Sequence, residues 1–132
     1  MKKPMILLIS YVLLISCQSD NSTLQTFELI GDWKLVEVLS DPGNGTGSFV
    51  SVDSEKTMTF LRDGTLTSNG SLCSLDYTSL VPTSGVYSLS DSTYTTNECG
   101  LSDIRYTFEK FENTLIVSYP CIEACQSKFV KQ

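Results

Sequence analysis

The sequence predicts an all-β domain, an eight-stranded up-and-down antiparallel barrel, and three features of the chain favour this fold class. Short segments rich in β-branched and aromatic residues recur between turn-forming residues. Apolar and polar side chains alternate within these segments with a period of two, which suits a closed barrel or a sandwich. Beyond the N-terminal apolar run, no segment has the 3.6-residue period of an amphipathic helix.

The sixth expected strand shows the alternation most clearly. Tyr106 and Phe108 fall on one of its faces, whereas Thr107 and Glu109 fall on the other. The same alternation, together with the turn-forming residues between segments, defines the other strands. The eight expected strands are residues 31–39, 57–61, 65–68, 85–89, 93–96, 105–111, 114–119 and 127–131.

The connections between these strands alternate in length. The second, fourth and sixth connections are tight turns with the sequences RDG, SDS and EN, and the other connections are several times longer. Successive connections of a meander lie at opposite ends of the barrel. We therefore expect all the tight turns at one end and all the long loops at the other.

Four cysteines lie in the long connections and are therefore expected together at one end: Cys73, Cys99, Cys121 and Cys125. In an exported protein, four such cysteines favour two disulfides. Because the sixth strand lies between the fifth and the seventh, the preferred pairing is Cys99–Cys121 with Cys73–Cys125. Closure of Cys121 onto Cys125 would need a strained five-residue loop. A zinc site with four cysteines is the alternative, but the chain lacks paired CxxC motifs.

The N-terminal segment has the anatomy of a secretory signal. Lys2 and Lys3 precede an apolar run at residues 5–15, which only Ser10 and Tyr11 interrupt. As a helix this run would span roughly 17 Å, which is too short for a hydrocarbon core about 30 Å thick. The segment therefore predicts export rather than a membrane-spanning anchor.

The apolar run ends at Leu14-Ile15-Ser16-Cys17, which resembles the lipobox of bacterial lipoproteins. The resemblance implies that the Cys17 thiol is lipidated and that residues 1–16 are removed as a lipoprotein signal peptide. It also implies that the protein is anchored in the bacterial cell envelope at the outer membrane, on either its periplasmic or its surface face. Residues 17–28 are then the lipidated cysteine and a polar tether, and residues 29–132 are the barrel domain. The alternative is an ordinary signal peptide with an incidental cysteine.

The first expected strand opens with Gly31-Asp32-Trp33, which resembles the G-x-W motif of lipocalins. Two further patterns, F-x-x-D-G-T at residues 60–65 and C-x-x-x-C…F-V-K at residues 121–131, are similar to small lipocalin-like lipoproteins. The resemblance implies that Gly31 and Trp33 form the closed base of the barrel. The chain lacks the T-D-Y motif and the arginine near the C-terminus that are typical of larger lipocalins. The alternative is a core tryptophan in another small β domain.

The composition argues against several functions. The chain contains no histidine, which removes Ser-His-Asp catalysis and most zinc sites, and it has no glycine-rich phosphate loop. The carboxylates are scattered singly, so no catalytic pair stands out. We therefore expect no enzyme activity, no cofactor and no metal. The formal net charge is −6, and removal of residues 1–16 would make it −8, so nucleic acid is not expected as a partner.

Two functions from different classes remain. The lipocalin resemblance implies a membrane-anchored carrier of a small hydrophobic ligand, whereas long loops suit an interaction module that contacts a protein or a glycan. Eight strands are wide enough either to hold one small ligand or to be filled by side chains. The aromatic residues expected to fill the interior are Trp33, Phe60, Tyr87, Tyr94, Tyr106, Phe108 and Phe129. Acidic residues expected around the loop end disfavour an anionic ligand: Asp41, Asp53, Asp76, Glu98, Asp103 and Glu123. No individual residue stands out as ligand-binding.

Overall fold

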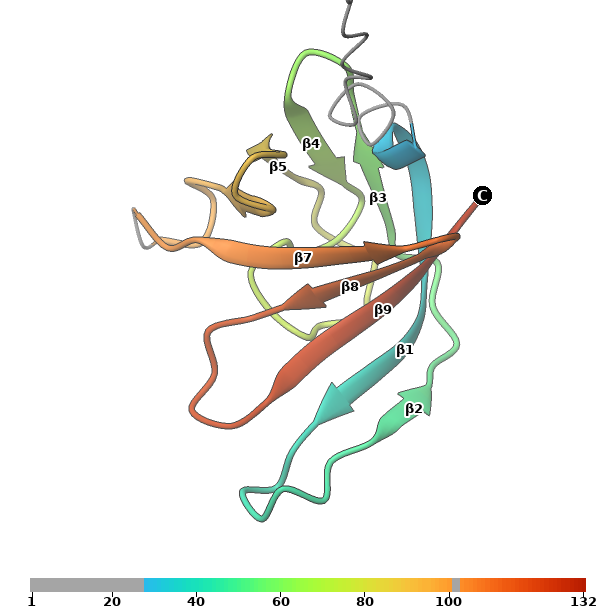
Figure 1. The fold of residues 1–132 in the computed structure, drawn as a ribbon, viewed down its shortest axis with the longest axis vertical. Coiled ribbons are helices and arrows are strands. Elements are labelled where there is room, and N and C mark those ends of the chain that lie inside the picture. The colour runs from blue at the N-terminus through green and yellow to red at the C-terminus, as the bar shows by residue number, and fades with distance from the viewer. Residues whose placement is uncertain (1–27, 101–102) are drawn as a thin grey trace, which may run out of the picture.

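A computed structural model of the chain describes residues 28–100 and 103–132, and in this part of the chain eight antiparallel strands close into a barrel (Figure 1). Each strand pairs with its neighbour along the chain, and the last pairs with the first from Trp33 opposite Lys131 to Ser40 opposite Cys125. This arrangement confirms the expected up-and-down barrel. The barrel strands are β1 (Gly31–Ser40), β3 (Thr57–Phe60), β4 (Thr65–Ser68), β5 (Thr83–Ser88), β6 (Thr93–Thr95), β7 (Tyr106–Phe111), β8 (Thr114–Ser118) and β9 (Cys125–Lys131).

A ninth strand, β2 (Phe49–Ser51), lies in a segment that was expected to be a loop. It pairs with β1 at Glu37 to Leu39, whereas β3 pairs with the first part of β1. Because β9 occupies the other edge of β1, β2 and β3 together form one interrupted strand. Three residues beside a glycine-rich loop are too few to show an alternating pattern, which explains why the sequence did not predict this strand.

The tight turns and the long loops lie at opposite ends of the barrel, as expected. The turns between β3 and β4, β5 and β6, and β7 and β8 adjoin the start of β1 and the end of β9. Positive φ angles occur in each turn, at Gly64 (87°), Ser92 (52°) and Glu112 (50°), and they let the chain reverse within a few residues. We call this end the base, and we call the end with the long loops the mouth.

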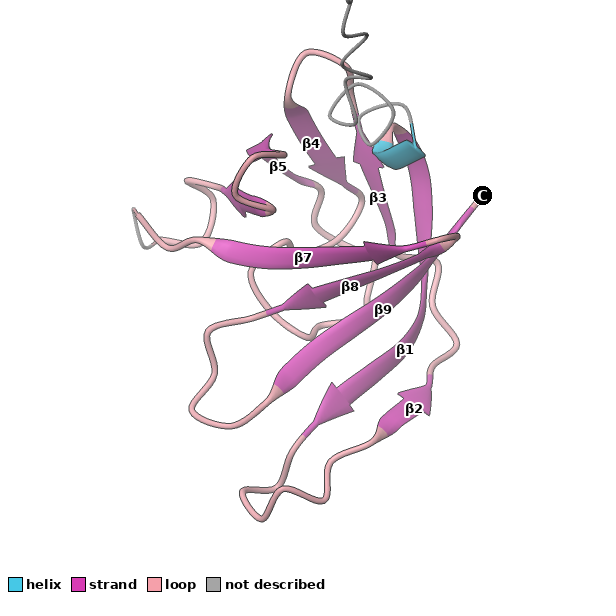
Figure 2. Cartoon of the chain, in the orientation of Figure 1, coloured by secondary structure: helices cyan, strands magenta, loops and turns pink. Residues whose placement is uncertain are grey.

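Trp33 closes the base. Its side chain is fully buried, and its Nε1 donates a hydrogen bond of 2.8 Å to the backbone oxygen of Leu29, which lies in a helical turn with Glu28 (Figure 2). The Nζ atom of Lys131 lies 4.7 Å from the centre of the Trp33 ring and donates to the backbone oxygens of Glu28, Leu29 and Ile30. Although the sequence lacks an arginine near its C-terminus, this lysine therefore provides a cation over the tryptophan.

Candidate functional site

Side chains fill the interior of the barrel. Phe60 makes edge-to-face contacts with Tyr87 and Phe108, with ring centroids 5.0 and 5.5 Å apart, and Tyr94 stacks on Tyr106 at 4.9 Å. Such pairs stabilise a core beyond the effect of their buried area alone. The buried hydrophobic residues include Trp33, Leu35, Met58, Phe60, Leu66, Leu72, Tyr94, Tyr106, Phe108, Leu115, Val117 and Phe129. An eight-stranded barrel either holds one small ligand or is filled by its own side chains, and this barrel is filled by its side chains.

The loop between β4 and β5 (residues 69–82, the plug loop) covers the mouth. Leu72 from this loop is 1% exposed and belongs to the core cluster. The Tyr94 hydroxyl donates a hydrogen bond of 2.6 Å to the Leu72 oxygen. Thr83 Oγ1 accepts from the Leu72 nitrogen at 3.1 Å and donates to the Gly70 oxygen at 2.6 Å. These bonds satisfy the buried backbone of the plug loop, which is the condition for placing a loop inside a core.

A buried lysine lies beneath the plug loop. The side chain of Lys56, which precedes β3, is 0% exposed, and its Nζ donates a hydrogen bond of 2.6 Å to the backbone oxygen of Asp76. The Asp76 carboxylate instead accepts from the nitrogen and hydroxyl of Thr78, both at 2.9 Å. Burial lowers the pKa of Lys56 to about 8, and the charge of Asp76 opposes this shift only in part. The burial of Lys56 was not predicted, because one lysine among polar neighbours carries no signal of burial in the sequence.

The two disulfides correct the expected pairing. Cys73 bonds to Cys99 with a Cα–Cα distance of 5.8 Å, and Cys121 bonds to Cys125 at 6.1 Å. The plug loop crosses the mouth toward the loop between β6 and β7, which brings Cys73 and not Cys121 beside Cys99. The end of β8 pairs with the start of β9, and the Tyr119 nitrogen bonds to the Cys125 oxygen. That chain reversal brings Cys121 and Cys125 together, so the short closure is compatible with the hairpin.

The loop between β1 and β2 (residues 41–48) is organised around Asp41. The Asp41 carboxylate accepts hydrogen bonds from the backbone nitrogens of Gly43, Asn44, Gly45 and Gly47 at 2.7–3.1 Å. These bonds lower the pKa of Asp41, the bond from Gly47 having the largest effect. The loop also contacts the loop between β8 and β9, where the Asp41 nitrogen bonds to the Ala124 oxygen at 2.9 Å.

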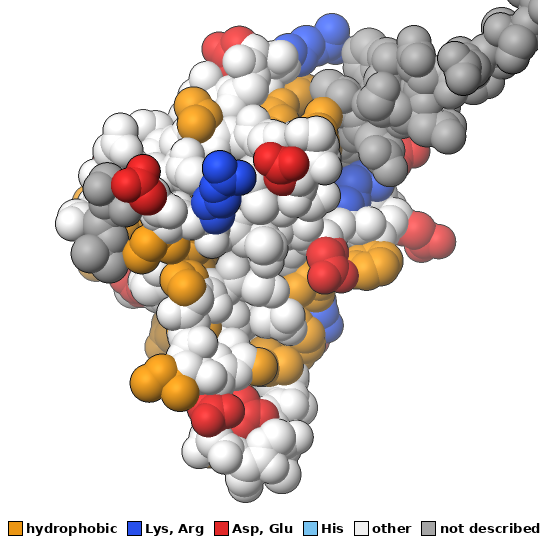
Figure 3. Space-filling view, turned by 60° about the vertical axis from the view of Figure 1, so that its left-hand side comes forward, with side chains coloured by type: hydrophobic (Ala, Val, Ile, Leu, Met, Phe, Trp, Pro, Cys, Tyr) orange, Lys and Arg blue, Asp and Glu red, His pale blue; other side chains and the backbone are white. Residues whose placement is uncertain are grey.

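The mouth combines acidic and apolar side chains. The expected rim acids all lie in or beside its loops; Asp41 and Asp76 accept bonds within their own loops, and Glu98 binds Ser84. Four exposed apolar residues lie in two of these loops: Tyr77, Leu80, Val81 and Ile122. Figure 3 shows acidic side chains and no basic ones at the lower end of the molecule, which the loop after β1 forms.

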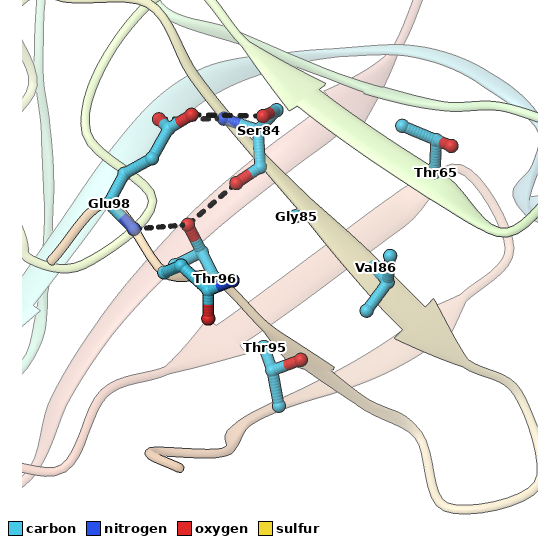
Figure 4. A pocket seen from close by; sticks show the side chains of 8 residues that line it. Thr65, Ser84, Gly85, Val86, Thr95, Thr96 and Glu98 are labelled. Atoms are coloured by element: carbon cyan, nitrogen blue, oxygen red, sulfur yellow. Dashed lines mark hydrogen bonds between the residues drawn. The ribbon is translucent and has the colours of Figure 1, made fainter. Parts of the chain in front are cut away.

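A separate shallow depression of about 370 Å³ lies on the side of the barrel over β4 to β6, and it was not predicted (Figure 4). The Glu98 carboxylate accepts from the nitrogen and the hydroxyl of Ser84, both at 2.9 Å, which holds it at one end of the depression. Hydroxyls and one amide form most of the remaining lining, so the depression offers hydrogen bonds to neutral polar groups. Its lining residues are Thr65, Ser84, Gly85, Val86, Thr95, Thr96, Asn97 and Glu98.

No family model, curated protein or solved structure matches the chain. Residues 28–100 and 103–132 contain no helix with the length and apolarity that a membrane span requires. In the same residues, no group of three or more metal-ligating side chains is placed to hold an ion. Cys17, residues 1–16 and most of the expected tether lie outside the described residues, so lipidation stays a prediction.

Proposed function

We propose that this chain is a lipid-anchored protein of the bacterial cell envelope whose barrel presents its mouth to a partner protein with basic and apolar side chains. The observation that carries the proposal is the chemistry of the mouth. Its loops hold seven acidic residues, the six expected rim acids and Glu55, and only two basic ones. Of the two basic residues, Lys56 is fully buried and Arg105 forms an ion pair with Asp91. The same loops expose Tyr77, Leu80, Val81 and Ile122. Exposed apolar groups among charges mainly of one sign favour a partner of complementary charge.

The loops of the mouth are held in place before a partner arrives. The Cys73–Cys99 disulfide and the buried Leu72 fix the plug loop, and the Cys121–Cys125 disulfide closes the loop that carries Ile122. A surface that is already ordered loses less conformational entropy on association than a flexible one. This order supports a contact surface built from loops.

The filled barrel favours this function over that of a carrier. A pocket for a small apolar ligand normally has a volume of roughly 300–1,000 Å³ and buries most of the ligand. Here the plug loop and the aromatic side chains occupy the interior instead. A carrier would have to move several buried side chains and the plug loop before it bound its ligand.

The expected anchor agrees with an outward-facing mouth. Residue 28, where the expected tether ends, adjoins Trp33 at the base. Residue 28 comes eleven positions after Cys17, and this length of chain spans at most about 40 Å. Because the expected tether joins the barrel at its base, the base would face the lipid and the mouth would point away from it.

Site-specific photocrosslinking in intact cells tests the proposal. A photoreactive amino acid in place of Leu80 at the mouth should give a discrete crosslinked protein, whereas the same group in place of Phe111 at the base should not. Both side chains are well exposed, at 81% and 59%, so the two variants form a matched pair. The crosslink should weaken with added salt and with Glu123→Lys. Equal crosslinking at both positions, or a stoichiometric lipophilic compound in an organic extract of the purified protein, would contradict the proposal.

A further inference from the structure

The loop between β1 and β2 contains Asn44-Gly45, one of two Asn-Gly pairs in the chain, the other being Asn69-Gly70. In such a pair the backbone nitrogen of glycine is close enough to Cγ, the amide carbon of the preceding asparagine side chain, to react with it. Glycine has no side chain to obstruct a reaction between these atoms. The two pairs have different surroundings, so the fold sets their reactivity separately.

The groups around Asn44 are placed to assist attack of the Gly45 nitrogen on the Asn44 side chain. The Gly45 nitrogen donates a hydrogen bond of 3.1 Å to Asp41 Oδ1, so the nucleophilic nitrogen faces a carboxylate. Asn44 Oδ1 accepts bonds from the nitrogen and the hydroxyl of Thr46, at 3.1 and 2.6 Å. Because a backbone nitrogen can only donate, the Thr46 bond also establishes which way the amide points. A carboxylate at the nucleophile and two donors at the reacting oxygen both assist acyl chemistry. The hydrogen bonds that lower the pKa of Asp41 keep it ionised at neutral pH and also make it a weaker base than a free carboxylate, so its expected contribution is modest.

We propose that Asn44 is a self-modification site, where this loop converts the asparagine to aspartate and isoaspartate. The Asp41 carboxylate takes the proton from the Gly45 nitrogen as that nitrogen bonds to Cγ of Asn44. The negative charge that develops on Oδ1 is stabilised by the two donors of Thr46. The bond from Cγ to the amide nitrogen then breaks, that nitrogen takes up the proton, and ammonia leaves a five-membered succinimide. Water opens this ring at either carbonyl, so the net change is hydrolysis of one amide and needs no other reactant.

Asn69-Gly70 is an internal control. Asn69 Oδ1 accepts from the Thr57 nitrogen and Nδ2 donates to the Glu55 oxygen, both at 2.8 Å, so both ends of its amide are held. The Gly70 nitrogen donates to the Ser68 hydroxyl rather than to a carboxylate. Gly70 is also packed so tightly that an added Cβ would clash with the backbone oxygen of Thr78. Ring closure would have to break this packing, so Asn69 should persist in the folded protein.

The modification would change the mouth itself. Asn44 is exposed, and its conversion adds one negative charge to a loop that contacts the β8–β9 loop through Asp41 and Ala124. Isoaspartate would also add one atom to the backbone. The inference rests on the geometry around Asn44 alone and stands whether or not the mouth binds a partner.

Peptide mapping by mass spectrometry tests the proposal. The intact protein and the same chain reduced and unfolded in urea are incubated side by side at neutral pH, and the mass gain of about 1 Da is followed at both asparagines. We expect Asn44 to convert at least about tenfold faster in the folded protein, a modest share of what positioned acid–base groups provide. Asn69 should convert more slowly in the folded protein than in urea. Slower or equal conversion of Asn44 in the folded protein would overturn the proposal.

Two variants separate chemistry from loop structure. Thr46→Val removes only the hydroxyl donor and should slow conversion severalfold. Asp41→Asn also disturbs the loop, so its decisive readout is the pH profile. With an ionised carboxylate as the base the rate should be nearly flat between pH 6 and 8, whereas a reaction driven by hydroxide rises about tenfold per pH unit. Glu123, whose carboxylate lies beside Gly43, is kept in every variant. A wild-type profile as steep as that of Asp41→Asn would show that Asp41 is not the base and would also overturn the proposal.

Discussion

The Nζ atom of Lys56 donates a hydrogen bond of 2.6 Å to the backbone oxygen of Asp76, inside the barrel and beneath the plug loop. This bond joins the segment before β3 to a loop twenty residues later in the chain. A buried ammonium with a carbonyl rather than a carboxylate as its partner is costly. The protonation state of Lys56 therefore affects how stably the plug loop closes the mouth.

Stability should rise with pH through the titration of Lys56. Its pKa is lowered from 10.5 to about 8, so between these values the unfolded chain binds more protons than the folded one. The free energy of unfolding should therefore increase across this window, by up to about 3 kcal/mol. Urea denaturation at pH 7 and pH 9.5 should measure about 2 kcal/mol of this rise. In Lys56→Met the rise should shrink, and any effect of Lys131, whose pKa burial also lowers, is the same in both proteins. An identical rise in the variant would contradict the assignment.

The plug loop should contribute to stability through Leu72 and not through its exposed tip. Leu72→Ala removes a fully buried side chain and should cost about 2–5 kcal/mol. Leu80→Ala in the same loop removes a side chain that is 81% exposed and should change stability by no more than about 0.5 kcal/mol. Thermal unfolding of the two variants compares them directly, and similar losses would show that Leu72 does not pack in the core.

The two disulfides should differ in their contributions. Cys73 and Cys99 are 26 residues apart, whereas Cys121 and Cys125 are 4 apart. Loop-closure entropy predicts that replacing Cys73 and Cys99 by serine lowers the free energy of unfolding by about 3–4 kcal/mol. Replacing Cys121 and Cys125 by serine should lower it by about 2 kcal/mol. Denaturant unfolding of the two double variants measures the difference. Mass mapping of the unreduced protein verifies the pairing, and a peptide that joins Cys99 to Cys121 would contradict the structure.

Lys131 should stabilise the base. Lys131→Met removes a cation over Trp33 and three hydrogen bonds to the backbone oxygens of residues 28–30, and it should cost about 1–2 kcal/mol. Trp33 is the only tryptophan, so its fluorescence reports unfolding without added probes. Lys34→Met breaks only a partly exposed ion pair with Glu55 and serves as the control, with an expected change within about 0.5 kcal/mol.

Membrane attachment should depend on Cys17. Cys17→Ser should release the protein from membranes, because the apolar run before it is too short to anchor the chain and Cys17 is the expected acylation site. Fractionation after a carbonate wash measures attachment, and labelling with a fatty-acid analogue should mark the wild type only. A variant that still sediments with membranes would rule out the lipoprotein hypothesis.

The strand pattern and the tight turns followed from the sequence because each depends on local properties, whereas the base position of Trp33 was implied by the resemblance of Gly31-Asp32-Trp33 to a known motif. Alternation with a period of two records which side chains face the core, as at Tyr106 and Phe108. Turn residues such as Asp63 and Gly64 set the short connections, and alternating connection lengths then place all four loop cysteines opposite the base. These conclusions needed only neighbours in the chain and the geometry of a meander.

The disulfide pairing, strand β2, the burial of Lys56 and the solid core required the tertiary structure. Strand adjacency suggested that Cys99 lies near Cys121, but the path of the plug loop brought Cys73 to Cys99 instead. That path depends on the packing of Leu72 in the core and on the hydrogen bond from Lys56 to the Asp76 oxygen. Both contacts join segments that are distant in the sequence. A long loop has many conformations of similar local energy, so packing against the rest of the barrel decides among them.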